Sequence, residues 1–320
     1  MPFEMLKEKW TNAVNTVKIG ATKEEGGTRT SVITVGGETT LPFLIDEGAM
    51  PNPPVIAMEF LDRMPADWPD VLKEPFKDAA DNPAKWALKC VNEYKAKLLC
   101  IRLWSAHPEN GNTSPADAAK AVKAVLDAVS VPLIIIGSGD DEKDNLVMAS
   151  VSQAAKGERC LLGSAVQKNY KTLTASCLAD GHNIISESPI DINIAKQVNI
   201  LICDMGFNSA RIVMDPTVGA LGYGMEYAYS IMERARTAAL NGDKMLSMPF
   251  IAFIGQEAWK AKEAKASDSE HPEWGPIAER GPMWEAATAA CYIQSGADIL
   301  VMRHPKAIES AQKVIDELMG

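Results

Sequence analysis

Eight short apolar runs, each ending in polar, glycine or proline residues and each followed by helical spacing, recur between Val55 and Met302. Runs such as Ile212–Met214 are apolar at every position, which is typical of strands covered on both faces in a parallel sheet. Eight strand–helix units in about 250 residues match the size at which such a sheet closes on itself. The sequence therefore predicts an α/β fold, a (β/α)8 TIM barrel.

The alternative architecture is an open, doubly wound sheet. No G-x-G-x-x-G follows the first predicted strand to support a dinucleotide site of that kind.

Residues such as Asn82 and Ser114 are expected to cap the helices that they precede. The eight strands are expected at Val55–Phe60, Leu98–Leu103, Pro132–Ile136, Cys160–Gly163, His182–Ile185, Ile212–Met214, Pro249–Ile254 and Asp298–Met302.

The first 50 residues do not follow this repeat. Their apolar spacing predicts a short helix over Leu6–Val17. Val17–Gly20 and Thr30–Val35 flank a polar segment with two glycines, which predicts a β-hairpin. Because so small a segment cannot bury a core alone, we expect residues 1–50 to pack as an extension on a barrel of residues 51–320.

Charge and hydropathy narrow the classes of partner. The 320 residues include 42 acidic and 32 basic side chains, a net charge of −10, which disfavours broad binding to a nucleic-acid backbone. No run approaches the roughly 20 apolar residues that span a bilayer, and the first residues lack a signal-peptide core. We therefore expect a cytoplasmic protein with neither nucleic acid nor membrane as partner.

The six cysteines are scattered along the chain without a C-x-x-C pair. Most have apolar neighbours, which is typical of buried reduced thiols. We therefore do not expect this chain alone to hold an iron–sulfur cluster or a structural zinc ion.

In a barrel of this kind, ligands meet the carboxyl ends of the strands. Some of the polar residues there are equally well explained as helix caps, namely Asp140, Ser188 and Thr217. Carboxylates at neighbouring strand ends, such as Glu187 and Asp215, could bind the amide edge of a heterocycle or transfer a proton. The candidate ring comprises Glu59, Asp62, Trp104, His107, Ser138, Gly139, Asp140, Ser164, Glu187, Ser188, Asp215, Thr217, Gln256, Glu257, Arg303 and His304.

Two further features lie at the same end of the predicted barrel. Gly255 and Arg303 occupy positions where many barrels hold a phosphate, although Met302 is not the small residue expected there. Residues 256–280 form a long insertion, which is either a solvated helix or a lid or docking arm. No Ser-His-Asp spacing and no H-E-x-x-H is present, so we assign neither catalytic nor metal-binding residues.

Three segments carry a resemblance to a known family. Pro53–Phe60, Met214–Gly224 and Gly281–Glu285, together with the eight units and the hairpin, resemble the small subunit of the corrinoid/iron–sulfur protein of the acetyl-CoA pathway. The resemblance covers essentially the whole chain.

This resemblance implies a non-catalytic methyl carrier rather than an enzyme. In that family a large subunit brings the [4Fe–4S] cluster and most of the corrinoid-binding domain, and the cobamide lies at the mouth of the small subunit's barrel. A methyltetrahydrofolate methyltransferase supplies the methyl group, and acetyl-CoA synthase receives it. The resemblance, taken with the ring, predicts that Glu187, Asp215, Thr217, Gly222, Tyr223 and Arg303 contact the cobamide.

Two other functions stay open at this point. Pterin-binding barrels related to dihydropteroate synthase and to methyltetrahydrofolate:corrinoid methyltransferase also have a turn like Asp215-Pro216 after the sixth strand. The Asn/Asp set expected of such enzymes is incomplete here, since the first two strand ends offer Glu59, Arg102 and Trp104 instead. A scaffold without a ligand is the third possibility, because the fold alone does not fix the function.

Overall fold

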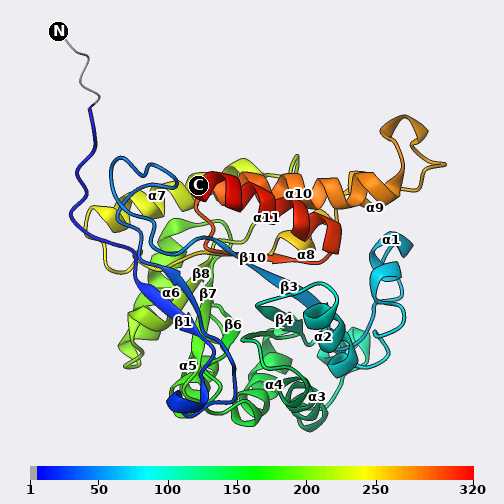
Figure 1. Ribbon diagram of the computed structural model, residues 1–320. Helices are drawn as coiled ribbons and strands as arrows, with labels where there is room; N and C mark the ends of the chain where they lie inside the picture. Colours follow the sequence, from blue (N-terminus) through cyan, green and yellow to red (C-terminus); the bar gives the residue numbers. More distant parts are fainter. Residues whose placement is uncertain (1–5) are drawn as a thin grey trace.

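The computed structural model describes residues 6–320, and eight parallel strands form its central barrel (Figure 1). The strands follow one another around the sheet, and Met214 N donates to Pro249 O at 2.8 Å where the last gap closes. The predicted barrel is confirmed, and an open doubly wound sheet is excluded. The strands are β3 (Val55–Leu61), β4 (Leu99–Arg102), β5 (Leu133–Ile136), β6 (Leu161–Ala165), β7 (Asn183–Glu187), β8 (Ile212–Asp215), β9 (Ile251–Ala252) and β10 (Ile299–Met302).

Helices surround this sheet and follow the predicted order. Asn82 Oδ1 accepts hydrogen bonds from the N–H groups of Ala84 and Lys85, and Ser114 Oγ accepts one from Asp117, so both expected caps are confirmed. No helix of the described residues is both long enough and apolar enough to span a bilayer. The helices are α1 (Asp70–Lys73), α2 (Pro83–Asn92), α3 (Pro115–Ala128), α4 (Asp141–Ala154), α5 (Tyr170–Asp180), α6 (Ile192–Asp204), α7 (Met225–Leu240), α8 (Ile254–Ala258), α9 (Lys262–Lys265), α10 (Ile277–Ser295) and α11 (Pro305–Met319).

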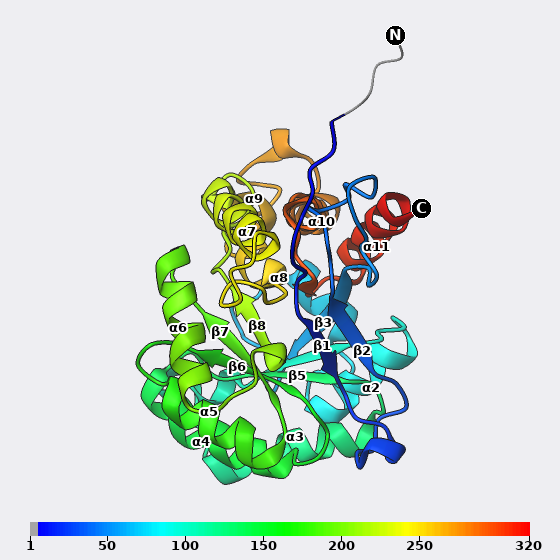
Figure 2. The same ribbon diagram turned by 90° about the vertical axis from the view of Figure 1, so that its left-hand side faces the viewer.

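The N-terminal extension contains the predicted hairpin but not the predicted helix. Strands β1 (Thr16–Ile19) and β2 (Ile33–Gly36) pair in antiparallel fashion, and Figure 2 views the molecule from their side. Residues 6–15 have no regular secondary structure. Their backbone hydrogen-bonds to other segments instead, with Thr11 N and Asn12 N both 3.1 Å from Leu240 O. A short helix is marginal in water, and these tertiary bonds replace it.

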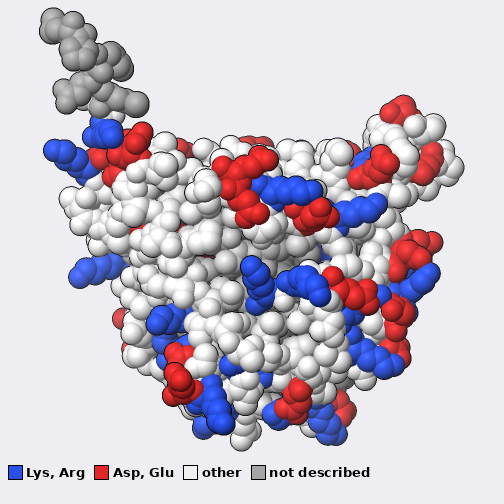
Figure 3. Space-filling model, in the orientation of Figure 1, with Lys and Arg blue, Asp and Glu red and all other residues white. Residues whose placement is uncertain are grey.

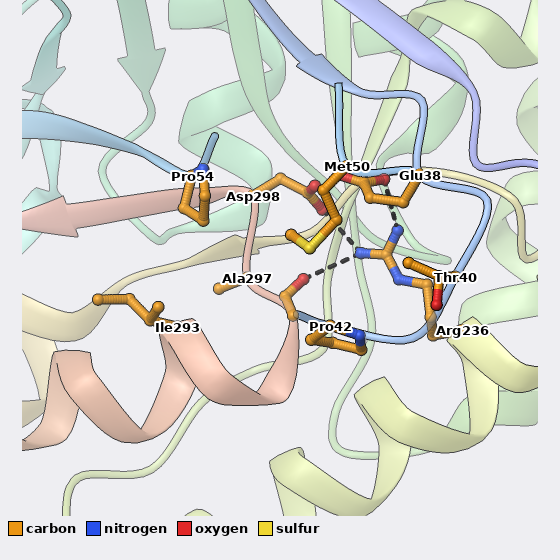
Figure 4. Close-up of a pocket in the computed structure, with 10 residues that line it drawn as sticks. Glu38, Thr40, Pro42, Met50, Pro54, Arg236, Ile293, Ala297 and Asp298 are labelled. Carbon is orange, nitrogen blue, oxygen red and sulfur yellow. Dashed lines mark hydrogen bonds and ion pairs between the residues drawn. The ribbon is translucent and has the colours of Figure 1, made fainter. Parts of the chain in front are cut away.

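A buried ion cluster ties this extension to the barrel (Figure 4). Arg236 on α7 donates from Nη1 to Glu38 Oε2 at 2.9 Å, and from Nη2 to Asp298 Oδ2 at 3.0 Å. Burial, followed by the charge of Asp298, raises the pKa of Glu38 to about 8. The cluster therefore joins the segment after β2, the helix α7 and the residue preceding β10.

The segment from residue 256 to 280, for which a solvated helix, a lid or a docking arm was predicted, is partly helical. It contains the end of α8, all of α9 and the first turn of α10, the longest helix of the described residues. Gly281 and Pro282 interrupt the sequence pattern of α10 and conceal it. Gly281 is needed for close packing, because a Cβ atom there would lie 2.7 Å from the Trp259 ring and 2.9 Å from Ala264 O.

Candidate functional site at the barrel mouth

Every second side chain of the barrel strands points into the lumen. Val55 and Ala57 on β3, and Ile299 and Val301 on β10, belong to or pack against one apolar cluster that fills it. Because strand side chains alternate between faces, the next positions of the same parity also face inward. These positions, at the carboxyl ends of five strands, are charged, so the apolar filling ends in a charged layer. The layer consists of Glu59, Arg102, Glu187, Asp215 and Arg303.

Glu59 binds two arginines from the strands on either side of β3. Arg102 Nε donates to Oε1 at 2.8 Å, and Arg303 Nε donates to Oε2 at 2.5 Å. Burial acts to raise the pKa of Glu59, but the charges of Arg303 and Arg102 outweigh it and hold that pKa below the ordinary value. The enclosed carboxylate therefore stays ionised and holds both guanidinium groups.

Aromatic rings cover one face of each guanidinium group. The Cζ atom of Arg303 lies 4.9 Å from the ring centroid of Trp68, and that of Arg102 lies 5.2 Å from the ring centroid of Phe253. Such cation–π contacts orient a guanidinium group as well as attracting it. Together with Glu59, the rings hold both arginines in fixed positions in the charged layer.

A second buried carboxylate supports this arrangement from α10. Glu285 accepts hydrogen bonds from Arg303 N at 2.5 Å, His304 N at 3.0 Å and Trp259 Nε1 at 2.7 Å. It thereby anchors the turn that leads from β10 into α11. Burial outweighs these donors and raises the pKa of Glu285 to about 7.

The raised pKa of Glu285 predicts a pH dependence of stability. Since this pKa is about 7 in the folded chain and ordinarily 4.5, the folded state retains a proton that the unfolded state has lost. The stabilisation is complete below pH 4.5 and disappears as the pH rises through about 7. Urea unfolding measures the free energy of unfolding of the wild type and of Glu285→Gln across this window, and this free energy should fall less steeply with pH in the variant. Glu38, whose pKa is also raised, causes part of the fall in both proteins. Equal slopes of the free energy against pH would contradict the prediction.

Glu187 and Asp215 form an acidic pair on the opposite wall. They are register partners on the neighbouring strands β7 and β8. Burial, and then the charge of Glu187, raises the pKa of Asp215 well above its ordinary value. Among the described residues, no group donates a hydrogen bond to the Glu187 carboxylate, and a hollow of about 340 Å³ opens beside it. This wall therefore offers both a carboxylate and a proton-retaining carboxyl group to a ligand.

Thr217 completes the turn after Asp215. Its backbone N–H donates to Asp215 Oδ1 at 2.9 Å, and its Oγ1 donates to Ser188 O at 2.6 Å. Thr217 has a φ of 58°, which is uncommon for a β-branched residue and costs backbone energy. The threonine therefore connects the ends of β7 and β8 and fixes the direction of the Asp215 carboxyl group.

Gly222 and Tyr223 lie farther along the same loop. Tyr223 OH donates to Glu263 Oε2 on α9 at 2.9 Å, so it is turned toward the α9 segment. An apolar groove of about 530 Å³ lies nearby, between this loop and α10, and Leu221 and Met283 are among its lining residues. The loop thus has one end in the barrel mouth and the other on an exposed apolar surface.

The structure therefore separates the six predicted cofactor contacts into two groups. Glu187, Asp215 and Arg303 are in the charged layer, Thr217 is beside it, and Gly222 and Tyr223 are on the outer loop. The ring as predicted also contained Glu59, but its pairing with Arg102 and Arg303 was not foreseen. Glu285 was missed altogether, because the helix that carries it was not predicted.

Metal ligands and cysteines are the other groups that could carry chemistry. Within residues 6–320, no group of three or more His, Cys, Asp and Glu side chains is placed to hold a metal ion. All six cysteines are free thiols, four of them buried and two partly exposed.

Comparison with known proteins identifies the family. Residues 16–314 match the model of the CO dehydrogenase/acetyl-CoA synthase delta subunit. The chain belongs to that family. It is 38% identical over 323 residues to the acetyl-CoA decarbonylase/synthase complex subunit delta of Archaeoglobus fulgidus, covering 99% of this chain and 71% of that protein. The delta subunits of Methanosarcina mazei and Methanocaldococcus jannaschii are 38% and 35% identical, and each alignment covers 98% of this chain and 72% or 76% of the relative.

Solved structures show that this chain shares its fold with dihydropteroate synthases. Dihydropteroate synthase from Xanthomonas albilineans is similar with a TM-score of 0.56 and 14% identity, over 87% of this chain and 98% of that one. The enzyme from Thermus thermophilus gives a TM-score of 0.50 and 15% identity, over 88% and 100%. At such low identity the similarity concerns the barrel alone.

Proposed function

We propose that the chain is the small subunit of a heterodimeric corrinoid/iron–sulfur methyl carrier. It covers the cobamide and helps to pass a methyl group from methyltetrahydrofolate, through a methyltransferase, to acetyl-CoA synthase. The observation that carries this proposal is the match to the delta subunit family over residues 16–314. The delta subunits of the relatives are named as parts of an acetyl-CoA decarbonylase/synthase complex.

The chemistry of the barrel mouth fits a corrinoid. The rim of a corrin ring carries carboxamide groups, which both donate and accept hydrogen bonds. The mouth offers donors from Arg303 and an acceptor at Glu187, which lines a hollow of about 340 Å³. We assign the contacts to Glu187, Asp215, Thr217, Gly222, Tyr223 and Arg303. A bound corrinoid supplies the methyl-accepting cobalt, and the chain supplies a shaped polar cover.

The partners follow from what this chain does not supply itself. The described residues contain no group of side chains that could hold a metal ion, and the pKa of the buried Cys90 thiol is raised by burial. We therefore assign the [4Fe–4S] cluster and most of the corrinoid-binding domain to a large subunit. The methyltransferase and the synthase must reach the cobalt in turn, so the cover over it has to move.

The first test combines size-exclusion chromatography with cobalt analysis. The chain alone should elute colourless, and after mixing with its large subunit it should elute as a coloured heterodimer that contains cobalt and iron. If it stays unpaired and instead binds methyltetrahydrofolate, a pterin enzyme is the better assignment.

A matched pair of variants tests the site within that heterodimer. Asp215→Ala removes an enclosed carboxyl group at the mouth and should lower the cobalt content per heterodimer. Asp204→Ala is the control, because that side chain is exposed at the end of α6. Both variants should keep the far-UV circular dichroism of the barrel. A cobalt content in Asp215→Ala equal to that of the control would contradict the assignment of this residue.

A further inference from the structure

The outer nitrogens of the two mouth arginines have no partner within the protein. Arg102 and Arg303 each use Nε to bind Glu59, and their Nη atoms donate to no group of the described residues. The two side chains are only 14% and 8% exposed. Their Nη atoms nevertheless remain in contact with solvent. Two fixed guanidinium groups therefore present free N–H donors to the open mouth.

The charges around this pair favour an anionic ligand. The two arginines and Glu59 together carry one net positive charge. On the opposite wall, the raised pKa of Asp215 keeps that group protonated to higher pH than an ordinary aspartate. Glu257, the next carboxylate on that side, is paired with Lys260 at 2.7 Å. Glu187 is the carboxylate that opposes an anion from across the mouth, so the excess positive charge is confined to the side of the two arginines.

Both guanidinium groups are preformed donors for an oxyanion. A guanidinium group presents its N–H donors in a planar fork that matches the oxygens of a carboxylate or phosphate. Here Glu59 holds both guanidinium groups through Nε. The Trp68 ring covers one face of Arg303, and the Phe253 ring covers one face of Arg102. Because the arginines are already held in place, binding an anion costs little further side-chain entropy.

We propose that Arg102 and Arg303 form a binding site for the oxyanion group, phosphate or carboxylate, of a small ligand that enters the barrel mouth. The site is a property of this chain alone. It can be tested without the cobamide or a partner subunit. Arg303 is also assigned to the cobamide, but the carrier function rests on the family match, so failure of this test would leave that function standing.

Isothermal titration calorimetry on the purified full chain tests the proposal directly. Inorganic phosphate and acetate are the probes, titrated separately in a buffer without other oxyanions. Binding of phosphate but not acetate identifies the ligand group as a phosphate, and the opposite result identifies it as a carboxylate. If neither probe binds, the proposal is overturned.

Conservative variants then locate the binding. Arg303→Lys and Arg102→Lys retain the positive charge but lose the fork, and each should weaken binding about tenfold, the loss expected for one charged hydrogen bond. Arg234→Lys, at an exposed position on α7, is the matched control and should bind like the wild type. Thermal unfolding of all the variants checks that they are folded. Affinities of both mouth variants equal to that of the control would overturn the proposal.

Discussion

Glu59→Gln is expected to lower the free energy of unfolding by about 3 to 5 kcal/mol, because it leaves two enclosed arginines without their counter-charge. Gln fills nearly the same volume as Glu, so the loss arises from charge and hydrogen bonding rather than from a cavity. In the wild type the Glu59 carboxylate is fully enclosed and accepts from both guanidinium groups, at 2.8 and 2.5 Å. The midpoint of guanidinium chloride unfolding measures the effect.

The control for this variant is a carboxylate in an exposed ion pair. Glu309 binds Lys313 at 2.8 Å on the outer face of α11, with both side chains about 70% exposed. Glu309→Gln should leave the unfolding midpoint almost unchanged, since exposed pairs contribute little. A Glu59→Gln variant as stable as this control would show that the buried cluster positions the arginines without stabilising the barrel.

Much of the barrel was predictable because its strands are covered on both faces. Continuous apolar runs mark such strands, and all eight predicted runs contain or overlap an observed strand, including the two-residue strand β9. The surrounding helices were predictable where caps such as Asn82 preceded a periodic pattern. The errors concerned Leu6–Val17 and α10, where tertiary hydrogen bonds or an internal glycine and proline override the local pattern.

The location of the site was predictable, but its internal pairing was not. Parallel strands place their carboxyl ends at one rim, which brings Glu187, Asp215 and Arg303 together without further information. The ion pair between Glu59 and Arg303 joins residues 244 positions apart, and it forms because β3 and β10 become neighbours when the barrel closes. Sequence spacing contains no signal for such a pair. Nor does it reveal the positive φ of Thr217.

The exposed surface away from the mouth contributes few interactions with a large effect on stability. On the face in Figure 3, acidic and basic side chains are interspersed with uncharged areas. Some exposed ion pairs of the protein lie within one helix, such as Lys123–Asp127 on α3 and Lys313–Glu309 on α11. Such pairs keep a helix soluble and contribute little energy. The interactions with large effects are instead the enclosed clusters at the two ends of the barrel.

The cluster at the amino end of the barrel gives the second large expected effect. Arg236→Met should lower the free energy of unfolding by about 3 to 5 kcal/mol near pH 8, because Glu38 and Asp298 then lie buried without their cation. In the wild type the side chains of Glu38 and Asp298 are only 5% and 6% exposed. Glu38 Oε2 lies 2.9 Å from Arg236 Nη1, and Asp298 Oδ2 lies 3.0 Å from Arg236 Nη2. Methionine retains most of the arginine's apolar contacts, which isolates the loss of charge.

The deficit of this variant should grow with pH. The pKa of Glu38 is raised to about 8, so the stability that its proton provides is complete below pH 4.5 and is lost as the pH rises through about 8. Removing Arg236 withdraws the attraction that favours the ionised form, and so raises the pKa of Glu38 further. Below about pH 8 both folded proteins keep this proton, so the added deficit appears only above about pH 8, where the wild type ionises and the variant does not. A deficit that does not grow from about pH 8 to about pH 10 would exclude this account of the cluster.

Arg234→Met, on the exposed face of the same helix, is the control for this experiment and should change neither the midpoint nor its pH dependence.

The shape of the unfolding transition shows whether the extension and the barrel unfold together. Arg236 connects the segment after β2 to the barrel through Glu38 and Asp298. If the extension folds as one unit with residues 51–320, Arg236→Met shifts a single cooperative transition. If the ion cluster supplies most of the stability of the extension, residues 6–50 become sensitive to protease while the barrel unfolds as in the wild type.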